Sequence, residues 1–146
     1  MKKKIIIFTS IIFILGVGAI FADKQINEDK LTYTKTNSID KVEIGKLLFE
    51  EYLRDTYENF ENDEGDIVNI LNDYEIIDAK LENSESEYVF KVAINYELQS
   101  IDGYSTVFIT GNGVEYKDNW VRDKYNIIEV EKVDDNKYKI IEIYTG

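Results

Sequence analysis

Apolar residues between Asn37 and Phe60 recur every three or four positions, which is the period of an α-helix with one buried face. Asn37 or Ser38 can cap this helix, and Asp40 would then lie in the first turn, where a carboxylate favours the positive helix end. We therefore predict one long helix that starts at residue 37 or 38. Its apolar stripe comprises Val42, Leu48 or Phe49, Tyr52 or Leu53, and Tyr57 or Phe60.

The segment after this helix predicts a short second helix and then a change of period. Ile67 to Leu71 are mostly apolar, and Asp66 could cap one or two helical turns there. From Tyr74 the apolar residues alternate with polar ones, which is the period of a strand. The predicted strands cover about residues 74–83, 88–99, 104–110, 120–133 and 137–144.

Turn residues separate these strands, and the connections are short. Asp102-Gly103 predicts a hairpin turn, and the three acidic or amide residues at 134–136 predict another. Because a parallel return needs a crossover of a dozen or more residues, neighbouring strands must be antiparallel. We predict an α+β fold: an N-terminal helix, plus the short second one, packed on a curled antiparallel sheet of four or five strands.

Residues 5–22 contain no charge and follow three lysines, a pattern typical of a signal peptide. The alternative is an uncleaved membrane anchor, because 18 residues at about 1.5 Å each reach roughly 27 Å, close to the thickness of a hydrocarbon core. In both cases the lysines stay inside and residues from Asp23 onward are extracytoplasmic, either secreted or anchored. The predicted organisation is a signal or anchor at 1–22, a polar linker at 23–37 and a single domain at 38–146.

The charge of the chain limits the classes of partner. The net charge is −12, and without residues 1–22 it is −15, with 14 basic and 29 acidic residues. Nucleic acid is not expected as a partner, because phosphate contacts require clustered Lys and Arg. Membrane contact is expected only through residues 5–22. The chain has no Cys, so neither a disulfide nor an acylated cysteine can hold the exported part.

The inventory of reactive groups is narrow. His and Cys are absent, which removes imidazole triads, thiol nucleophiles and the common zinc sites from this chain. The acidic segment around Gly65 does not fit a calcium loop, since Phe60 and Leu71 would occupy positions that need carboxylates. Gly111-Asn112-Gly113 indicates a turn rather than a phosphate site. No catalytic residue, metal ligand or cofactor is predicted.

Aromatic residues are the most suggestive candidates for ligand binding. They could line a concave surface between helix and sheet, where a pocket would suit an apolar or peptide-like ligand. The alternative is ordinary core filling, with hydroxyls that reach water at the rim. The candidate residues are Phe49, Tyr52, Tyr57, Phe90, Tyr96 and Trp120.

The order of the elements resembles the cystatin-like α+β roll, in particular small extracytoplasmic members of the nuclear-transport-factor-2-like superfamily. The resemblance rests on a leading helix that ends in YENFENDEGDIVNIL, on the strands that follow, and on the closing hairpin VEKVDDNKYKIIEIY, and it covers about residues 38–145. The superfamily contains isomerases, dehydratases, ligand-binding pockets and scaffolds that dimerise through the open sheet face. Its enzymes generally use Asp, His and Tyr deep in the cone, so the lack of His favours a role without catalysis.

The leading functional hypothesis is therefore a non-enzymatic, extracytoplasmic binding module that meets a protein or cell-envelope partner, or a second copy of itself through the sheet face. The alternative is a small lyase or isomerase that uses an Asp with a Tyr such as Tyr96. Inhibition of a peptidase is a third possibility suggested by the fold, although no inhibitory loop motif is recognisable.

Overall fold

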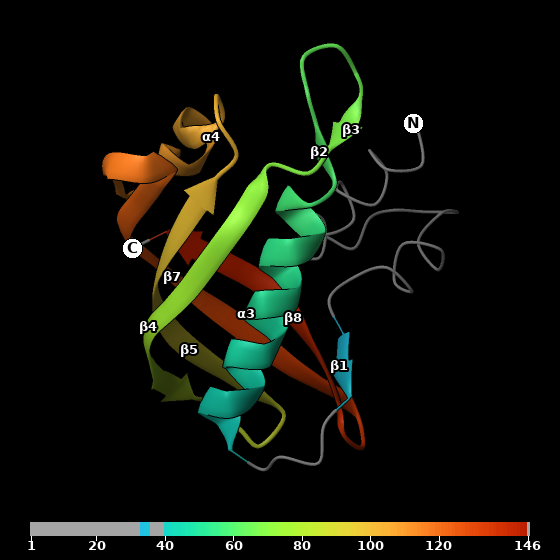
Figure 1. Cartoon of the computed structure of the whole chain (residues 1–146). Coiled ribbons are helices and arrows are strands. Elements are labelled where there is room, and N and C mark those ends of the chain that lie inside the picture. The colour runs from blue at the N-terminus through green and yellow to red at the C-terminus, as the bar shows by residue number, and fades with distance from the viewer. Residues whose placement is uncertain (1–32, 36–39, 146) are drawn as a thin grey trace.

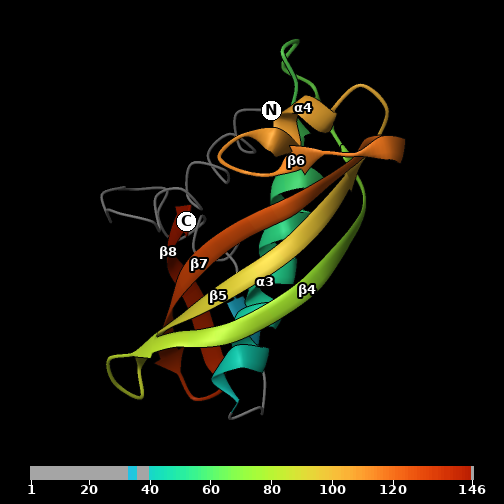
Figure 2. The same ribbon diagram turned by 90° about the vertical axis from the view of Figure 1, so that its left-hand side faces the viewer.

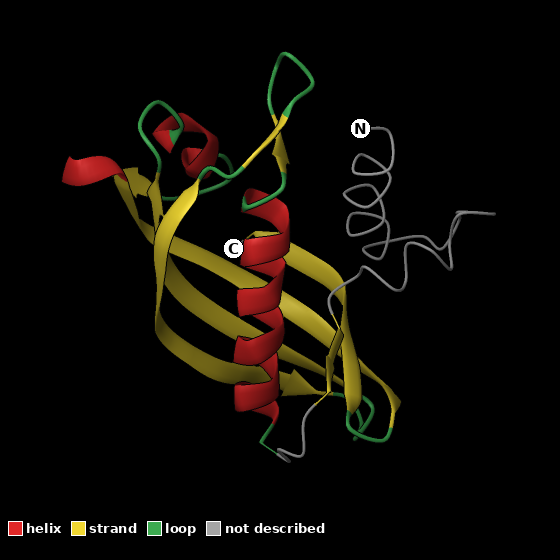
Figure 3. Cartoon of the chain, turned by 45° about the vertical axis from the view of Figure 1, so that its right-hand side comes forward, coloured by secondary structure: helices red, strands yellow, loops and turns green. Residues whose placement is uncertain are grey.

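One long helix lies across a curled antiparallel sheet in the computed structural model, which describes residues 33–35 and 40–145 (Figure 1). The helix is α3 (Lys41–Tyr57), and the sheet curls around it (Figure 3). The strand order is β1 (Tyr33–Lys35), β8 (Lys137–Thr145), β7 (Trp120–Asp134), β5 (Val89–Ser100) and β4 (Leu71–Ser84), and the short β6 (Val114–Glu115) also pairs with β7. The predicted α+β class, with a helix on a curled antiparallel sheet, is confirmed.

Helix α3 begins after Asp40, which is its N-cap rather than a residue of its first turn. The Asp40 backbone is extended, and its carboxylate accepts hydrogen bonds from the backbone N–H groups of Val42 at 2.9 Å and Glu43 at 3.4 Å. The predicted start at residue 37 or 38 is therefore wrong, and both of those residues lie outside the described part of the chain. The helix starts here because this carboxylate accepts hydrogen bonds from two free N–H groups and complements the positive end of the helix dipole.

The core lies between α3 and the inner face of the sheet. From the helix, Leu48, Phe49 and Leu53 are fully buried, and Gly45 allows close approach because a Cβ there would lie 2.7 Å from a methyl group of Val92. The alternation predicted for β5 is confirmed, since its inward residues are buried and most of its outward residues are only half-buried. The inward residues are Phe90, Val92, Ile94, Tyr96 and Leu98.

The predicted second helix is wrong, because this segment forms a hairpin instead. Strands β2 (Phe60–Glu61) and β3 (Ile67–Val68) are antiparallel, and Phe60 pairs with Val68. The Asn62 side-chain oxygen accepts hydrogen bonds from the backbone N–H groups of Glu64 at 3.0 Å and Asp66 at 2.9 Å. An asparagine side chain that satisfies the loop backbone competes directly with helix formation.

The strand predicted at 104–110 is also wrong. The turn at Asp102-Gly103 is formed, with a φ of +93° at Gly103, but the chain then enters the short helix α4 (Ser105–Ile109). The hydrogen-bonded neighbours of β5 are β4 and β7, not the segment that directly follows β5. Phe108 is fully buried against Tyr57, so tertiary packing overrides the strand propensity of these β-branched residues.

The N-terminal region differs from the prediction at one place. Tyr33–Lys35, which the sequence assigns to the polar linker, form β1 and pair with residues 137–139 of β8. The remaining linker residues that precede β1, and the segment 1–22, lie outside the described residues. Across residues 33–35 and 40–145, no helix combines the length and apolarity needed to span a membrane.

Two elements lie together at one end of the sheet. The β2–β3 hairpin and α4 both lie at this end, together with β6 and the 3-10 turn η1 (Lys117–Asn119) (Figures 1 and 2). The backbone N–H of Ile101 donates to the carbonyl of Ile70 at 3.0 Å, which ties the start of the α4 segment to the strand that leaves the hairpin.

Candidate functional site

Four of the predicted ligand-binding aromatics converge between α3 and β5. The rings of Phe49 and Tyr96 meet edge to face with centroids 4.8 Å apart, and the ring of Tyr52 lies 5.6 Å from that of Phe49. One helical turn further on, Tyr57 packs edge to face on Phe108 of α4 at 4.7 Å. These rings fill space between helix and sheet and belong to the core.

Phe90 and Trp120 do not join this cluster. Phe90 is buried six residues earlier on β5, where its ring centroid lies 6.4 Å from that of Tyr138 on β8. Leu98 points inward, so the next residue of β5, Gln99, points to the outer face of the sheet. Trp120 pairs with Gln99, and its half-buried side chain therefore lies on the same outer face. The six aromatics therefore do not line one common surface.

The Tyr96 hydroxyl has an amide partner rather than a carboxylate. It donates a hydrogen bond of 2.5 Å to the side-chain oxygen of Asn126, whose NH₂ group in turn donates to the Tyr144 carbonyl at 2.9 Å. Desolvation by burial raises the pKa of Tyr52, Tyr57 and Tyr96 above the ordinary value for a phenol. These hydroxyls are neutral at physiological pH, and the Tyr96 pair contains no base that could abstract a proton.

A buried lysine on β7 binds carbonyl groups at the end of α4. Lys124 is only 3% exposed, and its ammonium group donates to the carbonyls of Phe108 at 2.5 Å, Thr110 at 3.4 Å and Asn112 at 2.7 Å. Burial lowers the pKa of Lys124 to about 8, while the three carbonyl contacts engage all of its N–H donors. The amine is therefore a structural brace at the end of α4 and is not free to act as a nucleophile.

Sequence reasoning missed Lys124, although a signal was present. Every second residue of β7 points inward, as Val130, Ile128 and Asn126 do. The next residue on the same face, two positions earlier, is Lys124. A charged side chain at an inward position needs internal partners, because an isolated buried charge is costly. Its partners come from the segment after residue 104, which the sequence assigned to a strand.

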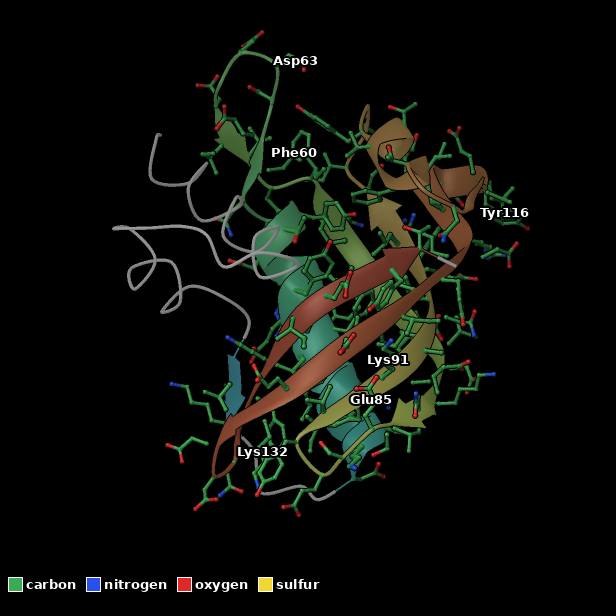
Figure 4. All side chains as sticks on the ribbon, turned by 180° about the vertical axis from the view of Figure 1, so that it is seen from behind. Phe60, Asp63, Glu85, Lys91, Tyr116 and Lys132 are labelled. Atoms are coloured by element: carbon green, nitrogen blue, oxygen red, sulfur yellow. The ribbon has the colours of Figure 1, made fainter. Side chains whose placement is uncertain are left out.

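An open depression separates the β2–β3 hairpin from α4, and we call it the end groove. Its volume is about 300 Å³. The rings of Phe60 and Tyr104 meet across it edge to face, with centroids 6.2 Å apart. Figure 4 shows Phe60 at the base of the hairpin and Asp63 at its tip. The groove is lined by Phe60, Asn62, Asp63, Glu64, Gly103, Tyr104, Thr106 and Val107.

Both walls of the end groove are held in place by hydrogen bonds. On the hairpin side, Asn62 closes the loop through its side chain, and its backbone N–H also donates to the Asp66 carbonyl at 2.9 Å. On the α4 side, Lys124 binds the carbonyls at the end of the helix, and the Tyr104 N–H donates to the Ile101 carbonyl at 3.2 Å. The groove is thus formed before any ligand arrives.

The surroundings of the end groove are acidic. No Lys or Arg occurs between Arg54 and Lys80, a stretch with nine acidic residues, or between Lys91 and Lys117, which encloses α4. Within residues 33–35 and 40–145, no lysine or arginine forms an ion pair with the exposed Asp63 or Glu64. The sequence shows the acidic segment but does not reveal the groove, because its local pattern predicts a helix at 67–71 and a strand at 104–110 where the structure has a hairpin and α4.

Charged side chains on the outer face of the sheet pair with one another. Lys91 contacts Glu129 at 3.6 Å, and Lys139 contacts Glu131 at 3.9 Å (Figure 4 marks Lys91). The Tyr144 hydroxyl lies 2.8 Å from a Glu129 oxygen and 2.6 Å from a Glu142 oxygen. No three acidic side chains in the described part of the chain are grouped so that they could hold a metal ion.

Replacing the buried lysine tests its role as a brace. We expect Lys124→Met to lower the free energy of unfolding by about 3 kcal/mol, because it leaves buried carbonyls of the α4 end without donors. The measurement is urea unfolding followed by far-ultraviolet circular dichroism. Lys117→Met removes the same charge at an exposed position and should change stability by less than about 0.5 kcal/mol. Equal effects of the two substitutions would contradict the brace.

The raised tyrosine pKa values predict a loss of stability in alkali. In the unfolded chain these phenols ionise near pH 10, whereas in the folded chain Tyr52, Tyr57 and Tyr96 keep their protons to higher pH. Above pH 10 the folded state then holds more protons, so the free energy of unfolding falls as pH rises, by up to about 1.4 kcal/mol per pH unit for each tyrosine. Below pH 10 this contribution is fully present.

Urea titrations at a series of pH values above neutrality measure this slope. Tyr57→Phe should make the alkaline decline shallower by about one proton, while Tyr116→Phe, at a side chain that is 44% exposed, serves as the control. An unchanged slope in Tyr57→Phe would show that its phenol ionises equally in both states.

Comparison of the chain with protein-family models, with curated proteins and with solved structures found no match. The resemblance to the cystatin-like roll thus rests on the order of the elements alone. The geometry of the described residues shows an apolar core between helix and sheet and an acidic, aromatic groove at one end.

Proposed function

We propose that this chain is a non-enzymatic, extracytoplasmic binding module that meets a protein or cell-envelope partner at the end groove. The main support for this proposal is the groove itself, an open hollow with two aromatic rings and with carboxylates that pair with no lysine or arginine of the described residues. Exposed aromatic surface beside polar groups is typical of recognition sites, because the rings supply contact area at little entropic cost. Its fixed walls favour binding further, since little ordering is needed when a partner arrives.

Two features favour binding over the alternative of a small lyase or isomerase. Such an enzyme would need a desolvated carboxylate beside the Tyr96 hydroxyl, but that hydroxyl is bound to the amide of Asn126. Among the described residues, the one buried amine that could act as a base or nucleophile is that of Lys124, and it is held by three carbonyls. Neither group is arranged for proton transfer to a substrate.

The groove is also a better docking surface than the outer face of the sheet, which a homodimer of this fold would use. Several charges on that face already have partners, including Lys91 with Glu129 at 3.6 Å and Arg122 with Glu97 at 3.4 Å. Covering such pairs removes them from water without adding new contacts, and the cost of that desolvation opposes association. A dimer through the sheet face therefore takes second place to a partner at the end groove.

The extracytoplasmic location rests on residues 1–22, which lie outside the described residues. We expect the mature chain to start at Asp23 or Ile20 if this segment is a cleaved signal, and at Met1 if it is an anchor. Mass spectrometry of the N-terminus decides between them. In cells whose outer layers are opened while the cytoplasmic membrane stays intact, an added protease should degrade an anchored domain, and a cleaved domain should appear in the released fluid. A chain that remains whole inside the membrane would overturn the location.

Site-directed photo-crosslinking in the cells that make the protein tests the binding role. A photoreactive residue at Thr106, an exposed position in the groove, should give a specific protein adduct, because a bound partner lies within a few ångströms. The same probe at Asp135, exposed in the hairpin between β7 and β8, is the matched control and should give none. No adduct at Thr106, or equal adducts at both positions, would contradict the proposal.

A further inference from the structure

We propose that the end groove accepts a lysine or arginine side chain from a basic peptide segment of the partner protein. This inference rests on the proposed binding function and names the chemistry of the ligand. Three features of the groove support it: the two aromatic rings, the acidic residues around them, and the extent of the acidic surface.

The two rings suit the stem and the charge of a long basic side chain. Phe60 and Tyr104 are half-buried, and their ring planes meet at 74°, edge to face. In this arrangement a ligand in the groove can contact the face of one ring and the edge of the other. A ring face attracts a cation, and the methylene groups of Lys or Arg pack well on aromatic carbon. Val107 adds further apolar surface to the same groove.

The charges around the rings specify a cation. Asp63 and Glu64 are exposed at the rim, and no cation of the described residues neutralises them. They lie between Arg54 and Lys80, a stretch with nine acidic residues and no basic one, so this segment contributes only negative potential. Such a potential attracts basic partners and accelerates their encounter.

The extent of the acidic surface favours a peptide segment over a small amine. The groove, at about 300 Å³, has room for one long side chain. Outside the groove, Asp66 is a further exposed acidic residue of the hairpin, and Asp102 is an exposed acidic residue just before α4. Neighbouring basic residues of an extended segment would therefore find carboxylates on both sides of the anchored one.

Binding of an acetylated and amidated hexalysine peptide to the purified chain tests this inference, measured by NMR chemical-shift changes and calorimetry. Shifts should concentrate at Phe60, Tyr104 and their neighbours, and affinity should fall as salt is added. A hexapeptide with all side chains acetylated should not bind. Asp63→Asn with Glu64→Gln should weaken binding about fivefold, which is the range expected for two exposed ion pairs.

A charge-matched control separates a specific site from general attraction to an acidic protein. Asp134→Asn with Asp135→Asn removes the same charge in the β7–β8 hairpin and should alter affinity less than twofold. Tyr104→Leu should weaken hexalysine binding at least as much as the loss of the rim charges, and its unfolding curve shows whether the variant is folded.

Four results would overturn the inference. Equal losses in the two charge-matched variants would show general attraction, and shifts outside the groove would show another site. Binding of 1,4-diaminobutane as tightly as hexalysine would show a site for small amines. If hexalysine does not bind but the Thr106 probe still crosslinks to a protein, the binding function stands and only the basic ligand is excluded. If the crosslink is also absent, both proposals fail.

Discussion

Burial of one face of α3 against the inner side of β5 is the interaction on which the rest of the structure depends. The chain has no cysteine, so no disulfide limits the unfolded state and stability must come from packing. Leu48, Phe49 and Leu53 of the helix are fully buried, and Gly45 lets the helix approach Val92 closely. The curl of the sheet around this helix places the hairpin and α4 at the same end, where they form the end groove (Figure 2).

Lys124 links this core to the end groove. Its carbon chain lies in the core side of β7, where a Cβ added at Gly113 would come within 2.9 Å of its Cγ, while its ammonium group fixes α4. Burying a charge costs free energy unless its hydrogen bonds are made, and here three carbonyls provide them. The result is a helix of five residues that keeps its position without a side-chain cap.

The candidate site was less predictable than the fold because its parts depend on contacts between distant segments. Residues 104–110 have the composition of a strand, yet Phe108 finds its place against Tyr57 and Lys124 rather than in the sheet. Residues 67–71 read as helical turns, yet Asn62 closes a loop that makes Val68 pair with Phe60. Trp120 was grouped with inward aromatics, whereas its register opposite Gln99 turns it outward.

The sequence by itself determined the α+β class, the amphipathic helix, and the long strands β4, β5, β7 and β8, because each of these is specified by a local period of apolar residues. It also determined the antiparallel arrangement of the hairpins, because short turns permit no other return. The tertiary structure alone decided the β2–β3 hairpin, α4, the inward Lys124 and the end groove. Each of these exists only through partners 8 to 51 residues away, and no local pattern encodes which partner will be met.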